Sequence, residues 1–308
     1  MDFSKLKSQS KSSLEKLSQE LSKMNQQFDN GKDDRFWQPN VDKAGNGFAV
    51  IRFLPSPGDE PVPFVRMWEH GFKGPSGQWY IEKSLTTINK PDPVSELNSK
   101  LWNMSSDDDS PSRKQVRAQK RKLNYICNIY VVQDQANPEN NGKVFLFKFG
   151  KKLFDKINEA MHPQFSDEQP LNPFDLWAGA NFKLKIRNVE GYRNYDKSEF
   201  GSSAPLFEDD EQMEAVWKRE HSLQAFLAPE NFKSYEELQT KLNKVLGINE
   251  NGTAAPAAAR AAAASRKPAD DEDDLPWQAP KQERAASAPS NVSEDDDEDM
   301  AFFKKLAG

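Results

Sequence analysis

A series of short stretches in which apolar or aromatic residues alternate with polar ones constrains the fold of this chain more than any other feature. Gly and Pro turns such as SPGDEP, KGPSG and NGKV separate the stretches. Because successive side chains of a strand point to opposite faces, alternation over such short lengths predicts β-strands. The predicted strands cover residues 47–55, 64–72, 78–85, 124–132, 143–150 and 181–192.

Two further stretches have the three- and four-residue spacing of helices. Residues 151–161 show this spacing, and residues 234–247 begin at a Ser that caps a helix and end at Gly247. Strands and helices do not alternate regularly, so a parallel βαβ fold is not expected. The sequence therefore predicts a mainly β fold with short helices, arranged as a small Greek-key barrel with helical insertions.

The composition divides the chain into three parts. Residues 1–30 form a basic amphipathic arm, in which apolar residues from Leu14 to Phe28 recur at helical spacing. Residues 31–250 form the core. Residues 251–308 are low in complexity and have too few apolar side chains to pack, so we expect a disordered acidic tail.

The end of the tail has the features of an interaction peptide. Acidic residues, among them Asp295, Asp296 and Asp297, precede the adjacent rings of Phe302 and Phe303. Neighbouring rings beside an acidic block are typical of a segment that binds a partner protein. The alternative is that this segment docks on the body of its own chain.

Several functional classes are not expected. With one cysteine, Cys127, the chain can build neither a disulfide framework nor a thiolate zinc cluster, and it suits a reducing compartment. The N-terminus lacks the apolar run of a secretion signal, and no stretch approaches the roughly 20 apolar residues of a membrane helix. We therefore expect a cytoplasmic protein with no membrane partner. Scattered histidines and the absence of a phosphate-binding loop or nucleophile elbow predict that it is not an enzyme.

The charge is unevenly distributed. Residues 252–308 contain twelve acidic and seven basic residues and so account for five of the six net negative charges. Within the nearly neutral body, residues 113–122 hold six cations and residues 143–152 hold four, with no acidic residue in either stretch. Basic strips on a neutral body suit a polyanion-binding surface, although each strip alone is more typical of solvated loops and strand faces.

Aromatic residues accompany these cations. Tyr125 follows Lys120, Arg121 and Lys122. Phe145, Phe147 and Phe149 alternate ahead of Lys151 and Lys152 and are expected to share one face of a strand, and Tyr192 and Tyr195 flank Arg193 after Arg187. Single-stranded nucleic acid offers a charged backbone and unstacked bases, and its binders combine cations with rings that stack on bases. Any single ring is more readily explained as part of the core, but three co-occurrences favour a single-strand binder.

Two other functions stay open. An RNA-binding translational regulator would need the same rings and cations. A replisome scaffold would act through the acidic tail alone, with a core that does not bind oligonucleotides.

Several collinear segments carry a more specific resemblance. They include VDKAGNGFAVIRFLPS (41–56), HGFKGPSGQWYIE (70–82), NPENNGKVFLFKFGKKLFDKIN (137–158) and GANFKLKIRNVEGYRNYDKSEF (179–200). In these segments the chain resembles the helix-destabilising single-stranded DNA-binding proteins of T-even-type bacteriophages, from the N-terminal arm to about residue 247. The resemblance implies an OB-fold core, a five-stranded Greek-key barrel. It also implies cooperative coating of single-stranded DNA during replication, recombination and repair in the infected bacterial host.

The resemblance also implies particular site residues. Its stacking residues correspond to Tyr125, Phe147, Tyr192, Tyr195 and Trp102, and its cationic contacts to Arg52, Lys120, Arg121 and Lys122. Self-association along DNA is implied for the arm residues Lys5, Lys7, Lys11, Ser12 and Ser13. The tail is implied to recruit replisome proteins such as a polymerase and a helicase loader.

The sequence departs from the resemblance at the metal site. The family uses one His and three Cys as zinc ligands, and only His70 matches, while Ser84, Asp92 and Ser95 stand near the other positions. One imidazole and one carboxylate do not complete a four-ligand structural site, so we expect no zinc and no other cofactor. Apolar packing of Trp79, Ile81, Ile88, Val94 and Leu97 is then expected to hold residues 70–100 together.

Overall fold

The computed structural model describes residues 33–165 and 167–248, in two units that divide between Gln38 and Pro39. In the first unit, Arg35 forms a two-bond ion pair with Asp33 just before the short strand β1 (Phe36–Trp37). The second unit holds every other described element. The predicted arm and acidic tail lie outside the described residues.

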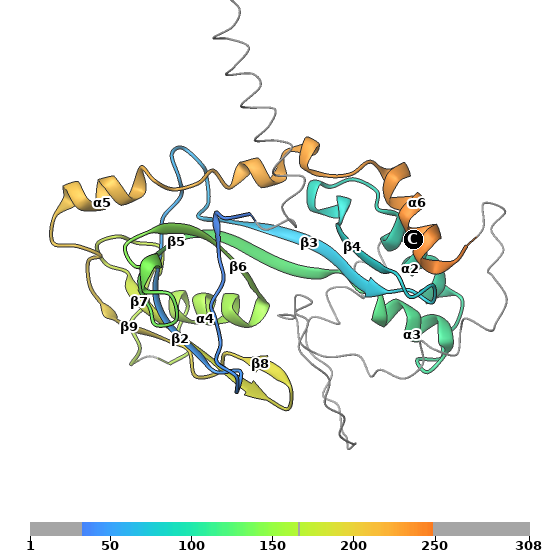
Figure 1. Cartoon of the computed structure of the whole chain (residues 1–308), viewed down its shortest axis with the longest axis horizontal. Coiled ribbons are helices and arrows are strands. Elements are labelled where there is room, and N and C mark those ends of the chain that lie inside the picture. The colour runs from blue at the N-terminus through green and yellow to red at the C-terminus, as the bar shows by residue number, and fades with distance from the viewer. Residues whose placement is uncertain (1–32, 166, 249–308) are drawn as a thin grey trace, which may run out of the picture. The chain divides into compact units, whose positions relative to one another are not determined.

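An antiparallel sheet organises the second unit, and the long strand β5 (Lys122–Asp134) is its centre (Figure 1). One edge of β5 pairs first with β3 (Phe64–Lys73) and then with β2 (Gly47–Phe53), while the other edge pairs with β6 (Val144–Gly150). β2 also pairs with β7 (Ala180–Val189), and β7 pairs with β8 (Tyr192–Asn194) and β9 (Glu199–Ser203). β3 and β4 (Trp79–Lys83) form a hairpin. The described chain is thus mainly β with short helices, as predicted.

The predicted strand over residues 181–192 is wrong at its end. Glu190 and Gly191 have φ values of 54° and 93°, so the chain turns there and continues as β8. Glycine adopts such a φ without strain, which makes this position suitable for a tight turn between paired strands.

The helices connect the strands or follow the sheet. α2 (Pro93–Asn103), α3 (Pro111–Ala118) and the 3-10 turn η1 (Leu85–Ile88) lie between β4 and β5, and α4 (Lys151–Met161) follows β6 directly. The turn η2 (Pro138–Asn140) connects β5 to β6. α5 (Asp210–Trp217), the turns η3 (Gln224–Leu227) and η4 (Pro229–Asn231), and α6 (Tyr235–Leu246) come after the last strand.

Helices α4 and α6 were predicted from the sequence, and local chemistry explains where α6 begins and ends. Both match the predicted ranges within one residue. α6 starts at a capping box between Ser234 and Glu237 and ends at Gly247, whose φ of 68° is the left-handed conformation that glycine adopts without strain. Helices α2 and α3 were not predicted from the sequence, although Asp92 and Ser110 cap them and each has Pro in its first turn.

The main core lies against the sheet, where β2, β5, β6 and β7 supply several of the largest fully buried side chains. They include Ile51, Phe53, Ile129, Leu146, Phe182 and Leu184. A second apolar cluster joins the β3–β4 hairpin and η1 to α6, and consists of Phe72, Tyr80, Leu85, Val94, Leu238, Leu242 and Val245. We call the part built by β3, β4, η1, α2, α3 and α6 the hairpin lobe.

The expectation for residues 70–100 was right for three side chains and wrong for two. Val94 is fully buried, and Ile88 and Leu97 pack against the cluster of the hairpin lobe. Trp79 and Ile81 are instead exposed. They alternate with Tyr80 along β4, and it is the face carrying Tyr80 that packs in the cluster with α6, a partner far away in the sequence.

Candidate nucleic-acid interface

Pairing of β5 with β6 brings together two basic stretches that are about 30 residues apart in the sequence. Asn124 is opposite Gly150 and Tyr125 is opposite Phe149 in this pair. The start of β5 and the start of α4 therefore lie at the same end of the two strands. We call the five cations gathered there the cationic end; they are Lys120, Arg121, Lys122, Lys151 and Lys152.

The first turn of α4 adds positive potential to this end. It carries Lys151 and Lys152 and no acidic residue. Cations at a helix N-terminus oppose the helix dipole and weaken the helix slightly, whereas an anion there is favourable. Lys151 also pairs with Asp155 one turn later at 3.3 Å, and the N-terminus of α4 itself favours an anion, so this turn suits a phosphate-binding surface.

Arg121 is held by its neighbours in a defined direction. Its guanidinium lies 4.0 Å from the ring centroid of Trp68 and donates a hydrogen bond of 2.8 Å to Oγ1 of Thr86. Trp68 and Thr86 were not predicted as site residues, because no local pattern links β3 and η1 to residue 121. The pairing of β3 with β5 creates this contact.

A row of stacked rings joins the two strands of the cationic end to α4. Phe147 and Phe149 share one face of β6, as predicted, with ring centroids 5.3 Å apart. Tyr125 stacks on Phe149 at 5.8 Å and on Phe154 of α4 at 3.9 Å with an interplanar angle of 3°. Phe154 is a member of the row that local sequence patterns did not identify.

Two of the predicted stacking rings are buried in the structure. Tyr125 is 6% exposed and Phe147 is 3% exposed. Bases can stack on these rings only when neighbouring groups move aside, so their role in base stacking stays a prediction. In the structure Tyr125 packs against Phe154 of α4, and Phe147 packs against Phe149 of β6.

The segment around β8 provides a second group of predicted residues. Tyr192 is 38% exposed, whereas Tyr195 is buried. The guanidinium of Arg187 donates two hydrogen bonds to the Asp196 carboxylate, and these lower the pKa of Asp196. Lys156 of α4 also donates to the backbone oxygen of Asp196 at 3.1 Å, which places α4 next to this segment (Figure 1). Arg193 is half-buried in β8.

Arg52 differs most from the expectation of a phosphate contact. It is 1% exposed, and its Nη2 donates to the backbone oxygens of Asp175, Leu176 and Ala204 at 2.8, 3.3 and 2.9 Å. In this structure the side chain ties β2 to two distant loops and presents no donor at the surface. The basic character of the residue did not indicate this burial.

Trp102 lies in α2 and not on the sheet that carries the other predicted rings. The guanidinium of Arg113 from α3 lies over its ring, 4.0 Å from the ring centroid. This contact joins α2 to α3 inside the hairpin lobe. A part for Trp102 in DNA binding therefore stays a prediction.

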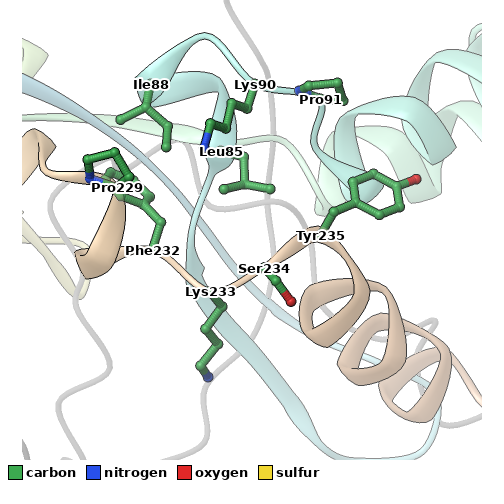
Figure 2. A pocket seen from close by; sticks show the side chains of 9 residues that line it. All are labelled: Leu85, Ile88, Lys90, Pro91, Pro229, Phe232, Lys233, Ser234 and Tyr235. Atoms are coloured by element: carbon green, nitrogen blue, oxygen red, sulfur yellow. The ribbon is translucent and has the colours of Figure 1, made fainter.

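A separate pocket opens on the hairpin lobe, as Figure 2 shows. Leu85, Ile88 and Pro91 line one side, and Phe232 and Tyr235 line the other. This largely apolar pocket shares no residue with the cationic end.

The remaining predicted site residues lie outside the described part of the chain. They are Lys5, Lys7, Lys11, Ser12 and Ser13 in the arm, and Asp295, Asp296, Asp297, Phe302 and Phe303 in the tail. Within residues 33–165 and 167–248, no three His, Cys, Asp or Glu side chains form a group able to hold a metal ion. No helix in those ranges has the length and apolar character needed to cross a membrane.

Comparison with known proteins agrees with this surface. Residues 45–246 match the protein family described as gp32 DNA binding protein like. The chain is 42% identical to the single-stranded DNA-binding protein of Enterobacteria phage T2 over 231 residues, which cover 73% of this chain and 74% of the relative. It is 40% identical to the single-stranded DNA-binding protein of Enterobacteria phage T4 over 256 residues, which cover 80% and 82%.

Proposed function

This chain belongs to the gp32-like DNA-binding protein family, and from that membership we propose that it binds single-stranded DNA without strong sequence preference. The observation that carries the proposal is the convergence of residues 120–122 with Lys151 and Lys152 at one end of the β5–β6 pair, next to a row of rings. Phosphates bind the cations, and exposed rings such as Tyr192 stack on bases.

Binding of this kind destabilises duplex DNA through linkage. A protein that binds the single strand and not the duplex shifts the equilibrium between them toward the single strand. No catalytic group is needed, which agrees with relatives that are named as DNA-binding proteins.

We infer that the core is an OB-fold. In support, β5 pairs antiparallel with β2, β3 and β6, an arrangement that suits a small, partly open barrel. The coarser description, a mainly β fold with short helices, does not depend on this inference.

The two ends of the chain have separate roles in the proposal. The arm residues Lys11, Ser12 and Ser13, with Lys5 and Lys7, dock on a neighbouring copy so that binding spreads along the strand. The acidic tail recruits replisome proteins during replication, recombination and repair, in the host cytoplasm where a phage genome is copied.

A salt-dependent titration tests the proposal. Tryptophan emission of the full chain is followed while homopolymeric single-stranded DNA is added at several salt concentrations. We expect an association constant whose logarithm falls linearly with the logarithm of salt, with a slope of about −0.7 for each phosphate neutralised. Absence of binding to single-stranded DNA would refute the proposal and favour the scaffold function.

A matched RNA titration addresses the other candidate. The described contacts use rings and cations that either polymer satisfies, whereas only RNA carries the 2′-hydroxyl. We expect tighter binding to DNA of the same base composition and length. A clear preference for RNA would instead support a translational regulator.

A further inference from the structure

A buried polar cluster occupies the place where the resemblance implies a metal site. The Asp92 carboxylate is its centre and is 1% exposed. Oδ1 accepts from the N–H groups of Val94 and Ser95 at 3.1 and 3.0 Å. Oδ2 accepts from the Ser84 hydroxyl at 3.0 Å and from the Leu85 N–H at 3.1 Å. One carboxylate therefore caps α2 and fixes the start of η1.

His70 connects this carboxylate to the end of α3. Its Nε2 lies 3.3 Å from Oδ1 of Asp92, a close contact that is not aligned as a hydrogen bond, and its Nδ1 lies 3.1 Å from the backbone oxygen of Gln119. Both atoms that face the ring nitrogens are hydrogen-bond acceptors, so the imidazole lies between the Asp92 carboxylate and the Gln119 backbone oxygen. Burial opposes ionisation of Asp92, but the imidazole and the N–H groups of Ser95 and Leu85 outweigh it and lower its pKa to about 2.

The cluster reaches the cationic end along two routes. In the first, the Ser84 hydroxyl lies 2.9 Å from Oγ1 of Thr86, which accepts the hydrogen bond from Arg121. The second route passes through the backbone oxygen of Gln119, the residue before Lys120. That oxygen contacts His70 and accepts from Nδ2 of Asn98 at 3.3 Å. The positions of residues 120 and 121 thus depend on a buried carboxylate.

The donor atoms do not fit a structural zinc ion. Such an ion takes four ligands, usually thiolates and imidazoles. Here Nε2 of His70 and Oδ1 of Asp92 are two strong ligand atoms, while Ser84 and Ser95 supply neutral hydroxyls in place of thiolates. Ser84 already donates to Asp92, and Oδ1 already accepts two N–H groups. A cation at this place would displace hydrogen bonds without completing its coordination.

We propose that the His70–Asp92–Ser84 cluster is a metal-free replacement for the structural metal centre of related proteins, and that it positions Arg121 and the start of β5 for the nucleic acid. The second clause rests on the proposed function and the first does not. Asp92 and Ser84 are positioning residues that act through Thr86 and Gln119. Leu85 follows Ser84 and Pro91 precedes Asp92 in the sequence. Figure 2 shows both of these apolar residues lining the pocket.

Metal content and histidine chemistry test the first clause without any variant. The purified full chain is washed with chelator, its zinc is measured by mass spectrometry, and its imidazole nitrogens are observed by ¹⁵N NMR. We expect far less than one zinc per chain and a His70 imidazole signal without the shift that metal binding causes. One chelator-resistant zinc per chain, or a metal-bound imidazole signal, would overturn it.

A gain-of-metal variant tests whether the cluster stands at the metal position. The triple variant S84C/D92C/S95C keeps His70 and supplies three thiolates. We expect it to take up one zinc per chain when refolded with zinc chloride, while the wild-type chain does not. Failure of the folded variant to take up zinc would contradict the assigned position.

Substitutions test the connection to DNA. In D92N we expect the amides of Leu85, Val94 and Ser95 to exchange hydrogen about 10- to 100-fold faster, because charge-assisted hydrogen bonds are weakened. The matched control is D109N, which removes an equally charged but 89% exposed carboxylate that pairs with Lys114. If D92N does not fold, S84A removes a single donor and is measured in its place. Unchanged amide exchange in the folded variant would overturn the role of Asp92 in holding the starts of η1 and α2.

The variant T86V separates positioning from stability. It removes the Oγ1 acceptor that Arg121 uses at residue 86 and leaves all hydrogen bonds of Asp92 in place. We expect an affinity for homopolymeric thymidylate about 3- to 10-fold weaker with wild-type amide exchange around Asp92. Wild-type affinity in T86V would refute the second clause. Absence of DNA binding by the wild-type chain would refute the proposed function while leaving the zinc and exchange results intact.

Discussion

Replacement of Arg52 by Met distinguishes a structural arginine from a phosphate contact. Met has a similar length and no hydrogen-bond donor. The substitution leaves the oxygens of Asp175, Leu176 and Ala204 without the guanidinium that now binds them. Gly179 lies against the same group, and a Cβ atom there would come within 2.8 Å of Nη2. The site is thus built closely around the arginine head group.

The hydrogen-bond geometry sets the size of the expected loss. Each hydrogen bond from a charged donor contributes about 1.5–3 kcal/mol, and two of the three bonds have good lengths. Burial of the charge opposes this gain and lowers the pKa of Arg52. R52M also removes the cost of burying the charge, which offsets part of the loss. We therefore expect R52M to lose about 3 kcal/mol of unfolding free energy, which corresponds to a Tm lower by roughly 6–12 °C for a core of this size.

Thermal unfolding and DNA titration together decide between the two roles. Circular dichroism of R52M should show a lower Tm, while the salt slope of DNA binding stays at the wild-type value. A phosphate contact predicts the opposite result: an unchanged Tm and a slope reduced by about 0.7. That outcome would refute the structural interpretation of Arg52.

Three further predictions concern charge. The double variant K151A/K152A should reduce the salt slope of DNA binding by about 1–1.5, because phosphates bind at the start of α4. The control K218A/K244A removes one lysine after α5 and one in α6, and it should leave the slope unchanged. Burial and the nearby Glu60 raise the pKa of Glu220 from 4.5 to about 9, so the folded chain binds the extra proton and stability falls as pH rises between these values. E220Q should therefore raise Tm at pH 7 to 9, and an equal Tm in both proteins at pH 9 would contradict this. We also expect the acidic tail to compete with DNA for the cationic end, because residues 252–308 carry five excess negative charges. Deletion of these residues should therefore strengthen DNA binding and duplex melting at low salt, and unchanged affinity would refute this competition.

Local chemistry made part of the fold predictable. The Ser234 cap and Gly247 fix the ends of α6 through hydrogen bonds within one or two turns, and alternation fixes the face shared by Phe147 and Phe149. These features depend on residues that are near in the sequence. The spacing of cations and rings likewise indicated a nucleic-acid binder, because such a surface needs both kinds of side chain close together.

Other parts of the site depended on contacts between distant segments. Basic character could not indicate that Arg52 is buried, because the three oxygens that bind it come from loops more than 120 residues away. The exposure of Trp79 and the burial of Tyr80 follow from the packing of α6 on one face of β4. Phe154 and Trp68 became part of the interface in the same way.

The sequence by itself determined most of the strand segments, the helices α4 and α6, the acidic composition of the tail and the class of ligand, because alternation, capping and charge act over a few residues. The tertiary structure alone decided which cations gather and which are buried, because strand pairing joins residues 120–122 to residues 151 and 152 regardless of the chain between them. It also decided that Asp92 meets His70 and Ser84 in one buried cluster. Burial removes water from these groups, so the folded surroundings set whether a charge binds a ligand or holds the fold together.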